Sequence, residues 1–299
     1  MMHTTTKRVL YSLSSRGLLN WMPDWMYLKI MYYARLDKRL NLANPHTFNE
    51  KLQWIKLYDR RPVYTMMVDK YEVKKYVSSL IGEKYIIPTY GVWKSFDEID
   101  FGQLPNQFVL KCTHDSGGLI ICRDKEQLSI CDTKKKINDC MKKNFYWHGR
   151  EWPYKDVNPR IIAEKYMVDE SGNDLKDYKV MCFNGVPRLI ELHKGRFTDH
   201  QTQDFYDTNW NKTTISQNGT STYQVSSDTV PCPNTLDEML SLSAVLSKGI
   251  PHVRVDWYSI VDRLYFGELT FFDGSGFDPY DDPNDDELLG SWITLPNRK

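Results

Sequence analysis

The spacing of apolar residues along the chain changes near Pro88. Before it, apolar positions recur at helical intervals, as at residues 48, 52, 55 and 57 of the segment TFNEKLQWIKLYDR. Thr47 followed three residues later by Glu50 has the spacing of a capping box. Gly82 stands where a helix C-cap glycine is expected. These patterns predict helices over residues 24–80.

After Pro88, short β-preferring runs are separated by turn residues. The runs are FVLKCTH, GLIICRD, RIIAEKYM, DYKVMCFNG and PRLIELHKG. Asn184–Gly185 predicts a hairpin, and HVRVDWYSIVDRLYFGELTFF predicts two strands joined through Val261–Asp262. Helices are predicted over about 132–146 and from Thr235. The pattern therefore indicates an α+β fold with antiparallel sheets.

Composition narrows the class of protein. The chain has 299 residues with 41% hydrophobic and 26% charged composition, which is typical of a soluble protein with two or three compact units. Its formal net charge is zero at pH 7, so no overall field favours nucleic acid as a partner. The six cysteines contain no CxxC pair, and no run reaches 18 apolar residues. We expect a cytoplasmic protein with reduced thiols, no secretory signal and no transmembrane helix.

Charge is unevenly distributed along the chain. The first 40 residues hold seven Lys or Arg against Asp24 and Asp37, whereas residues 266–299 hold eight acids against Arg298 and Lys299. The basic end suits either a solvated face or peripheral contact with the inner surface of a membrane.

The segment FVLKCTHDSGG runs from a strand into paired glycines. Glycines allow backbone N–H groups to approach an anion, and Lys111 would add positive charge. The segment contains neither GxxxxGK[ST] nor GxGxxG, so a plain hairpin and a phosphate-binding loop both remain open for Gly117–Gly118. His114 suits either a phosphate contact or a structural hydrogen bond.

The last predicted hairpin carries a second polar cluster. Alternation places Arg254 and Asp256 on one face of the first strand, and Glu268 and Thr270 on one face of the next. Two carboxylates and a hydroxyl are oxygen ligands that suit Mg²⁺, and an arginine suits a developing oxyanion. A cross-strand salt bridge on a solvated face is the alternative.

The ordered set of motifs resembles the ATP-grasp superfamily, most closely its TupA-like group found with bacterial polysaccharide and teichuronopeptide synthesis. The resemblance runs from about Tyr27 to Trp292. It implies ATP and Mg²⁺ as cofactors. It assigns Arg254 and Lys179 as catalytic residues and Asp256, Glu268 and Thr270 as metal ligands. The residues that it implies for nucleotide binding are Lys70, Lys111, His114, Ser116, Gly117, Gly118, Glu164, Lys165, Met167 and Lys179.

The resemblance also implies an ATP-grasp fold in which two α+β subdomains enclose ATP. Residues 1–88 would form a helical N-terminal region, 89–167 the small lid subdomain, and 168–299 the large subdomain with the metal hairpin. In this chain Asp115 stands where the loop commonly has glycine, and Thr270 replaces the usual asparagine. The α/β domain that usually precedes the grasp is not visible in residues 1–88.

The activity implied is that of an ADP-forming carboxylate–amine ligase working through an acylphosphate. Its partners would be a small-molecule or glycan substrate with a carboxylate, such as a uronic acid of a capsular or cell-surface polysaccharide, and an amine or amino acid. A phosphotransferase on the same scaffold, a capsular glycosyltransferase and a non-catalytic nucleotide-binding module are the alternatives. The glycosyltransferase would favour a DxD motif at a strand end, which the sequence lacks.

Overall fold

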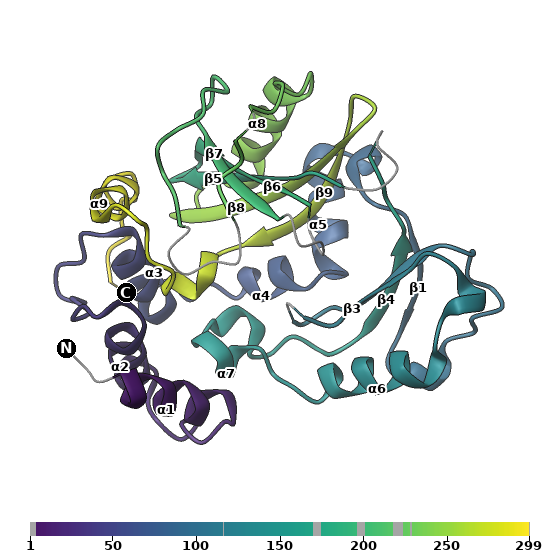
Figure 1. Cartoon of the computed structure of the whole chain (residues 1–299), viewed down its shortest axis with the longest axis horizontal. Coiled ribbons are helices and arrows are strands. Elements are labelled where there is room, and N and C mark those ends of the chain that lie inside the picture. The colour runs from purple at the N-terminus through teal and green to yellow at the C-terminus, as the bar shows by residue number, and fades with distance from the viewer. Residues whose placement is uncertain are drawn as a thin grey trace.

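Two antiparallel sheets form the frame of the molecule, and helices cover their outer faces (Figure 1). The computed structural model describes residues 4–115, 117–169, 175–195, 201–217, 224–227 and 229–298. Within them, α6 packs on the four-stranded sheet and α8 packs on the five-stranded sheet. The predicted α+β fold with antiparallel sheets is therefore confirmed.

The four-stranded sheet has the order β1-β4-β2-β3. Its two inner strands are almost entirely buried. They consist mainly of apolar, β-preferring residues such as Phe108, Leu110 and Ile161. With Ile137 of α6 these side chains form a separate small core. The strands are β1 (Thr89–Trp93), β2 (Phe108–Cys112), β3 (Leu119–Cys122) and β4 (Ile161–Lys165).

The five-stranded sheet has the order β7-β6-β5-β8-β9. Both predicted tight hairpins are present, and their central residues have the positive φ angles that such turns require: 50° and 83° at Asn184–Gly185, 45° and 60° at Val261–Asp262. The strands are β5 (Asp177–Phe183), β6 (Val186–Lys194), β7 (Thr202–Tyr206), β8 (His252–Ile260) and β9 (Arg263–Thr270).

A β-bulge interrupts the pairing of β8 with β9. Val255 pairs with Leu269 and Trp257 pairs with Phe266, so Gly267 and Glu268 both lie opposite the single residue Asp256. A Cβ on Gly267 would approach the Asp256 carbonyl oxygen to 3.1 Å, which favours glycine there. The bulge therefore places Glu268 next to Asp256.

Helices dominate the segment before β1, as the apolar spacing predicts. The capping box of Thr47 and Glu50 is present, and Gly82 ends α5 with φ 101°. These helices share one large core with the five-stranded sheet, and no described helix is long and apolar enough to cross a membrane. The helices are α1 (Thr4–Ser15), α2 (Asp24–Leu36), α3 (Phe48–Tyr58), α4 (Val63–Val68), α5 (Glu72–Ile81) and η1 (Glu83–Tyr85).

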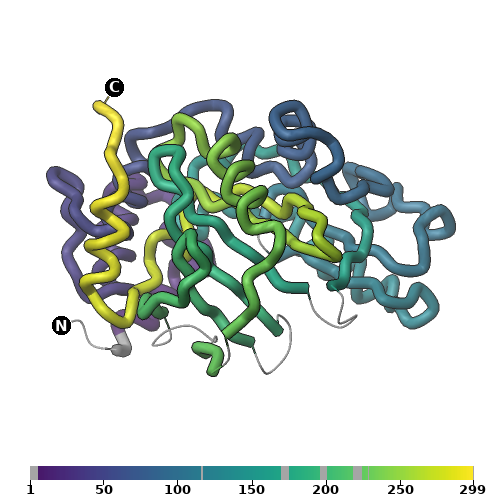
Figure 2. Tube along the Cα trace, turned by 90° about the horizontal axis from the view of Figure 1, so that it is seen from above, coloured from purple at the N-terminus to yellow at the C-terminus, as the bar shows by residue number. Residues whose placement is uncertain are grey.

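The remaining helices surround the sheets. The helix predicted over 132–146 is α6 followed by the short α7, and the one predicted from Thr235 is α8. α9 packs against α3. The first and last parts of the chain lie at the same end of the molecule (Figure 2). The bounds are η2 (Phe96–Glu98), η3 (Lys125–Gln127), α6 (Ile130–Met141), α7 (Tyr146–Gly149), η4 (Trp152–Tyr154), α8 (Leu236–Leu246), η5 (Asp273–Gly276) and α9 (Pro283–Ser291). The division of the chain at residues 88 and 167 stays a prediction.

Arg150 attaches the first two helices to the rest of the protein. Its side chain is 1% exposed, and its Nη2 donates to the carbonyl oxygens of Leu19 at 2.9 Å and Met22 at 3.2 Å. Its guanidinium carbon also lies 4.5 Å from the ring centroid of Tyr27 and 4.6 Å from that of Trp147. A single buried cation therefore joins the α1–α2 connection, α2 and α7.

We expect Arg150→Ala to lower the free energy of unfolding by about 3 kcal/mol, because it leaves buried carbonyl oxygens without a donor and opens a cavity. Urea denaturation measures this change. Arg39→Ala, which removes an exposed arginine, should cost less than about 0.5 kcal/mol. Equal losses in the two variants would contradict the anchoring role.

Candidate active site

Three cavities adjoin one another between the two sheets and the N-terminal helices. The apolar cavity, of about 130 Å³, shares Lys111, Leu119, Glu164 and Tyr258 with the central cavity, of about 120 Å³. The central cavity in turn shares Glu268 with the N-terminal cavity, of about 380 Å³. The three cavities therefore follow one another, from a mainly apolar lining through a charged one to one that mixes charged and aromatic side chains.

The apolar cavity lies against the end of β4. Its apolar lining includes Ile87, Val109, Ile121, Met167 and Val168. Lys165 also lines it, and its backbone N–H donates to the Pro88 carbonyl oxygen at 3.0 Å. Apolar side chains therefore form most of this lining, and the Lys165 backbone N–H is already paired within the protein.

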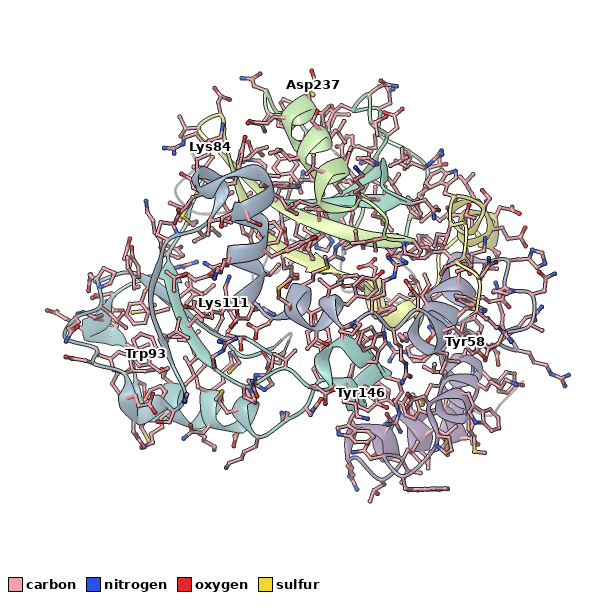
Figure 3. The ribbon with its side chains drawn as sticks, turned by 180° about the vertical axis from the view of Figure 1, so that it is seen from behind. Tyr58, Lys84, Trp93, Lys111, Tyr146 and Asp237 are labelled. Atoms are coloured by element: carbon pink, nitrogen blue, oxygen red, sulfur yellow. The ribbon has the colours of Figure 1, made fainter. Side chains whose placement is uncertain are left out.

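Glu164 stands between the apolar and central cavities and holds two lysines. Lys111 Nζ lies 2.6 Å from Glu164 Oε2, and Lys74 Nζ contacts Oε1. Burial opposes the charge of this carboxyl, but the two ammonium groups outweigh it and hold the pKa of Glu164 at about 2. Figure 3 shows Lys111 in the space between the sheets.

Two lysines contribute positive charge to the lining of the central cavity. Lys70 and Lys111 line it together with the loop residues Gly117 and Gly118. Lys70 Nζ donates to the carbonyl oxygen of Asp115 and lies 3.7 Å from Glu268 Oε2. Lys70 therefore connects the loop of the four-stranded sheet to a carboxylate on β9.

The loop after β2 is held by Asp115. The carboxylate of Asp115 accepts the N–H of Gly118 at 2.9 Å and the thiol of Cys140 at 2.7 Å. A Cβ on Gly118 would lie 2.7 Å from Cys112 Sγ, so close packing requires glycine there. Ser116 lies outside the described residues.

A row of alternating charges crosses the inner face of the five-stranded sheet below the central cavity. Lys179 on β5 pairs directly with Glu191 on β6 and with Asp256 on β8. Lys179 Nζ lies 2.6 Å from Asp256 Oδ2 and 2.9 Å from Asp177 Oδ2. All four side chains are buried, so the ammonium compensates charges that water does not reach.

Arg254 uses all five of its N–H groups on protein oxygens. Nε and Nη2 donate to Asp256 at 2.8 and 2.9 Å, and Nη2 also donates to Thr270 Oγ1 at 3.4 Å. Nη1 donates to Glu191 Oε2 at 3.4 Å and to Asp273. Burial works against the charge, but these carboxylates raise the pKa of Arg254 well above its usual value.

The bulge gathers oxygen ligands around this row. Asp256 lines the central cavity, Thr270 lines the N-terminal cavity, and Glu268 lines both. Carboxylate oxygens on neighbouring positions are the donors that Mg²⁺ prefers, so Asp256 and Glu268 fit that ion. Thr270 Oγ1 instead lies next to Arg254.

The structure brings together most of the residues assigned from sequence. Lys70, Lys111, Gly117, Gly118, Glu164, Asp256 and Glu268 line the central cavity. Lys165 and Met167 line the apolar cavity, and Arg254 and Lys179 support the carboxylates from below. His114 lies apart from both linings: it is buried, with Nε2 3.1 Å from the Lys143 carbonyl oxygen.

Four further residues belong to the site and were not assigned from sequence. Lys74 is the second lysine of the segment DKYEVK, whose first lysine is Lys70. The motif that indicated Lys70 therefore also includes Lys74. Asp177 alternates with Lys179 on β5, which places both on one face. Glu191 and Asp273 reach Arg254 from β6 and η5, and no local pattern in the sequence signals these contacts.

The chain was compared with protein-family models, curated proteins and solved structures. A family model described as TupA-like ATPgrasp matches residues 50–294. No curated protein matches the chain. Among solved structures, D-alanine–D-alanine ligase from Helicobacter pylori is 13% identical, with 83% of this chain and 69% of that chain covered at a TM-score of 0.43.

Two other solved structures extend the comparison. D-alanine–D-alanine ligase from Bacillus anthracis complexed with ATP is 15% identical at a TM-score of 0.37; it covers 69% of this chain, which spans 54% of that one. ATP-grasp ligase PsnB, complexed with a minimal precursor, Mg and ADP, is 10% identical at a TM-score of 0.40, with 98% and 75% covered.

The charge on Glu164 predicts a pH dependence of stability. Because the folded pKa of about 2 lies below the unfolded value of 4.5, ionised Glu164 stabilises the fold above pH 4.5, and this contribution disappears as pH falls toward 2. The difference in pKa corresponds to a contribution on the order of 3 kcal/mol. We expect Glu164→Gln to lose this amount at pH 7 and less at about pH 3.

Urea denaturation of both proteins at the two pH values measures this convergence. Glu126→Gln, which neutralises an exposed carboxylate, is the matched control and should stay close to wild type at both. A loss in Glu164→Gln that is independent of pH would show that shape, and not charge, accounts for the effect.

Proposed function

The chain belongs to the TupA-like ATP-grasp family, and from that premise we propose that it is an ATP-dependent carboxylate–amine ligase. One observation carries the proposal: an apolar cavity, a lysine-lined cavity and a pair of adjacent carboxylates follow one another in a continuous track. This order matches a base, its phosphates and a reaction centre. The family places the chain in the ATP-grasp ligase superfamily, and the bond formed is part of the proposal.

In this proposal the adenine occupies the apolar cavity. Met167 and Val168 would contact the faces of the base, and the backbone near Lys165 would contact its edge. The phosphates would lie in the central cavity, where Lys70 and Lys111 offer ammonium groups and Gly117 brings a backbone N–H group. The N–H of Gly118 donates to the Asp115 carboxylate instead. Glu164 forms ion pairs with Lys111 and Lys74, and these pairs fix the positions of both ammonium groups.

Asp256 and Glu268 would hold Mg²⁺, with Thr270 as a third candidate oxygen. The ion would supply charge neutralisation of the transferred phosphoryl group. The resemblance assigns Lys179 and Arg254 as catalytic residues. Because each already donates to Asp256, we propose that they act by fixing the direction of its oxygens. Ser116 remains an expected phosphate contact, whereas the position of His114 favours the structural hydrogen bond to the Lys143 carbonyl oxygen.

The chemistry follows from this arrangement in two steps. An oxygen of the substrate carboxylate attacks the γ-phosphorus, and the bond to the β-phosphate oxygen breaks to release ADP. The nitrogen of the amine then attacks the acyl carbon, a C–N bond forms, and inorganic phosphate leaves with the acyl–oxygen bond cleaved; the amine gives up a proton. Lys70 and Lys111 stabilise the charge that develops on the phosphoryl oxygens.

The finer substrate assignment rests on the resemblance to the TupA-like group. We propose a uronic acid of a bacterial capsular or cell-surface polysaccharide as the acid and an amino acid or other amine as the nucleophile. A cytoplasmic position at the inner face of the membrane would suit this role, with the basic N-terminal end of the chain as the surface in contact.

We expect the purified protein to release ADP and to form a hydroxamate when it is incubated with Mg-ATP, glucuronate or galacturonate, and hydroxylamine. Hydroxylamine captures an acylphosphate because it attacks the activated acyl carbon. Colorimetric detection of the hydroxamate with a parallel ADP assay measures both products. Consumption of a nucleotide sugar with ATP untouched would favour the glycosyltransferase, and a stable phosphorylated product the phosphotransferase.

We expect Glu268→Gln to lower the rate of hydroxamate formation by at least about 10²-fold, because a neutral amide is a poor ligand for Mg²⁺. Thermal melting should stay close to that of the wild type, since the Glu268 side chain is 37% exposed. Glu287→Gln makes the same change at an exposed position of α9 and should retain full activity. Unchanged activity in Glu268→Gln would remove this residue from the metal site.

A further inference from the structure

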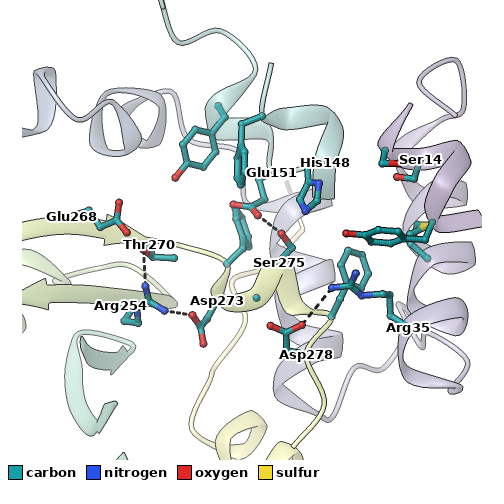
Figure 4. A pocket seen from close by; sticks show the side chains of 18 residues that line it. Ser14, Arg35, His148, Glu151, Arg254, Glu268, Thr270, Asp273, Ser275 and Asp278 are labelled. Atoms are coloured by element: carbon teal, nitrogen blue, oxygen red, sulfur yellow. Dashed lines mark hydrogen bonds and ion pairs between the residues drawn. The ribbon is translucent and has the colours of Figure 1, made fainter. Parts of the chain in front are cut away.

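The N-terminal cavity, of about 380 Å³, adjoins the proposed reaction centre. Glu268, Thr270 and Arg254 form its inner end (Figure 4). From there it extends past η5 toward α1 and α2, where Ser14 and Arg35 lie at its outer end. A molecule in this cavity would therefore reach the carboxylate that borders the central cavity.

One wall of this cavity comes from a part of the chain that the family match does not include. Ser14 and Arg35 lie on α1 and α2, whereas the match begins at residue 50. The wall is fixed in place: Ser14 Oγ lies 2.6 Å from Tyr27 OH, which donates to the His148 carbonyl oxygen at 2.9 Å. The N-terminal helices thus contribute a fixed wall to the cavity.

Carboxylates outnumber guanidinium groups in the lining, and the Lys56 ammonium group lies behind it, next to Phe272 and Phe277. Glu151, Asp273 and Asp278 line the cavity in addition to Glu268, against Arg35 and Arg254. The five N–H groups of Arg254 already donate to protein oxygens, as described above. Arg35 lies 3.5 Å from Asp278, in a pair whose side chains are 34% and 47% exposed, so solvent weakens their attraction.

Burial makes the ionised form of these carboxyl groups costly, although a cation next to each of them favours it: Lys56 for Glu151, Arg254 for Asp273 and Arg35 for Asp278. Burial is the main cause that raises the pKa of all three groups, with that of Asp273 reaching about 6. Neighbouring carboxylates add to the effect: Glu191 raises the pKa of both Asp273 and Asp278. A cation that entered the cavity would reverse this tendency.

Aromatic rings complete the lining and suit the same kind of ligand. Phe272 and Phe277 line the cavity, and Lys56 Nζ lies 5.5 and 4.6 Å from their ring centroids. The two rings therefore already bind one protein ammonium group through their π faces. Tyr11, Phe145 and Tyr154 also line the cavity, and the Arg35 guanidinium carbon lies 5.4 Å from the Tyr11 ring centroid.

We propose that the N-terminal cavity binds the amine co-substrate as a cation, between the carboxylates Asp278, Glu151 and Asp273 and the aromatic rings, with Ser14 and Arg35 of the N-terminal helices shaping its outer end. This inference rests on the proposed ligase function and adds which of the two substrates the cavity takes. An anionic acid in the same space would meet unfavourable charge from these carboxylates.

Direct binding tests this assignment without requiring turnover. Glucosamine, its neutral N-acetyl derivative and glucuronate are the probes, added to wild-type protein saturated with Mg²⁺ and a non-hydrolysable ATP analogue. We expect glucosamine to bind at least about tenfold more tightly than either of the others, as measured by isothermal titration calorimetry. Glucuronate binding as tightly as glucosamine, or no binding of glucosamine, would overturn the proposal.

Two substitutions with opposite expected effects sharpen the test. Asp278→Asn removes a carboxylate and should weaken glucosamine binding about tenfold while leaving the N-acetyl derivative unaffected. Arg35→Gln removes the cation that competes for Asp278 and should leave glucosamine binding unchanged or stronger. Glu287→Gln, an equivalent charge removal on exposed α9, is the control and should match the wild type.

The rival occupant gives the reverse pattern. If the cavity held the acid, Arg35→Gln would weaken glucuronate binding and Asp278→Asn would strengthen it. The hydroxamate assay keeps this inference separate from the ligase function, because hydroxylamine replaces the amine there. Hydroxamate formation together with the reversed binding pattern would overturn the inference alone. Failure of all acids to yield ADP would overturn the ligase function.

Discussion

Charge compensation on the inner face of the five-stranded sheet is the constraint on which the site depends. Asp256, Glu191 and Asp177 are all buried, and each would be costly to ionise without a partner. Lys179 and Arg254 supply the compensating charges through contacts as short as 2.6 Å. Removing one member leaves the others buried and unpaired, which typically costs about 3–5 kcal/mol. The row is therefore preformed, and the orientation of Asp256 is set before any ligand arrives.

The same row explains how a metal ion could be accommodated. Asp256 is shared between Lys179 and Arg254, whereas Glu268 has one partly exposed partner, Lys70, at 3.7 Å. Burial disfavours the charge of Glu268, but Lys70 and Lys179 outweigh it and lower its pKa. Glu268 thus favours the ionised form, and a divalent cation bound to it would take the place of Lys70, which lies 3.7 Å away. Lys70 would then be available to a phosphate.

Alternation and turn residues were enough to predict much of this region from the sequence. They placed Arg254 with Asp256 on one face and identified both hairpin turns. The bulge at Gly267 and Glu268 was not predicted, because it depends on the pairing between two strands. The contacts of Glu191 and Asp273 with Arg254 were not predicted either, because they join separate elements of the fold. The β1 and β7 strands were not among the predicted runs, and the wall formed by α1 and α2 depends on tertiary contacts across more than 100 residues.

The separation of the two cores gives the cavities their character. The four-stranded sheet has its own small core, while the N-terminal helices share the large core of the five-stranded sheet. Lys70 lies between α4 and α5, and it reaches both the Asp115 carbonyl on the loop and Glu268 on β9. A ligand that displaced Lys70 from Glu268 would thereby loosen a link between the loop and the five-stranded sheet. The loop and the carboxylate on β9 are thus connected through one lysine side chain.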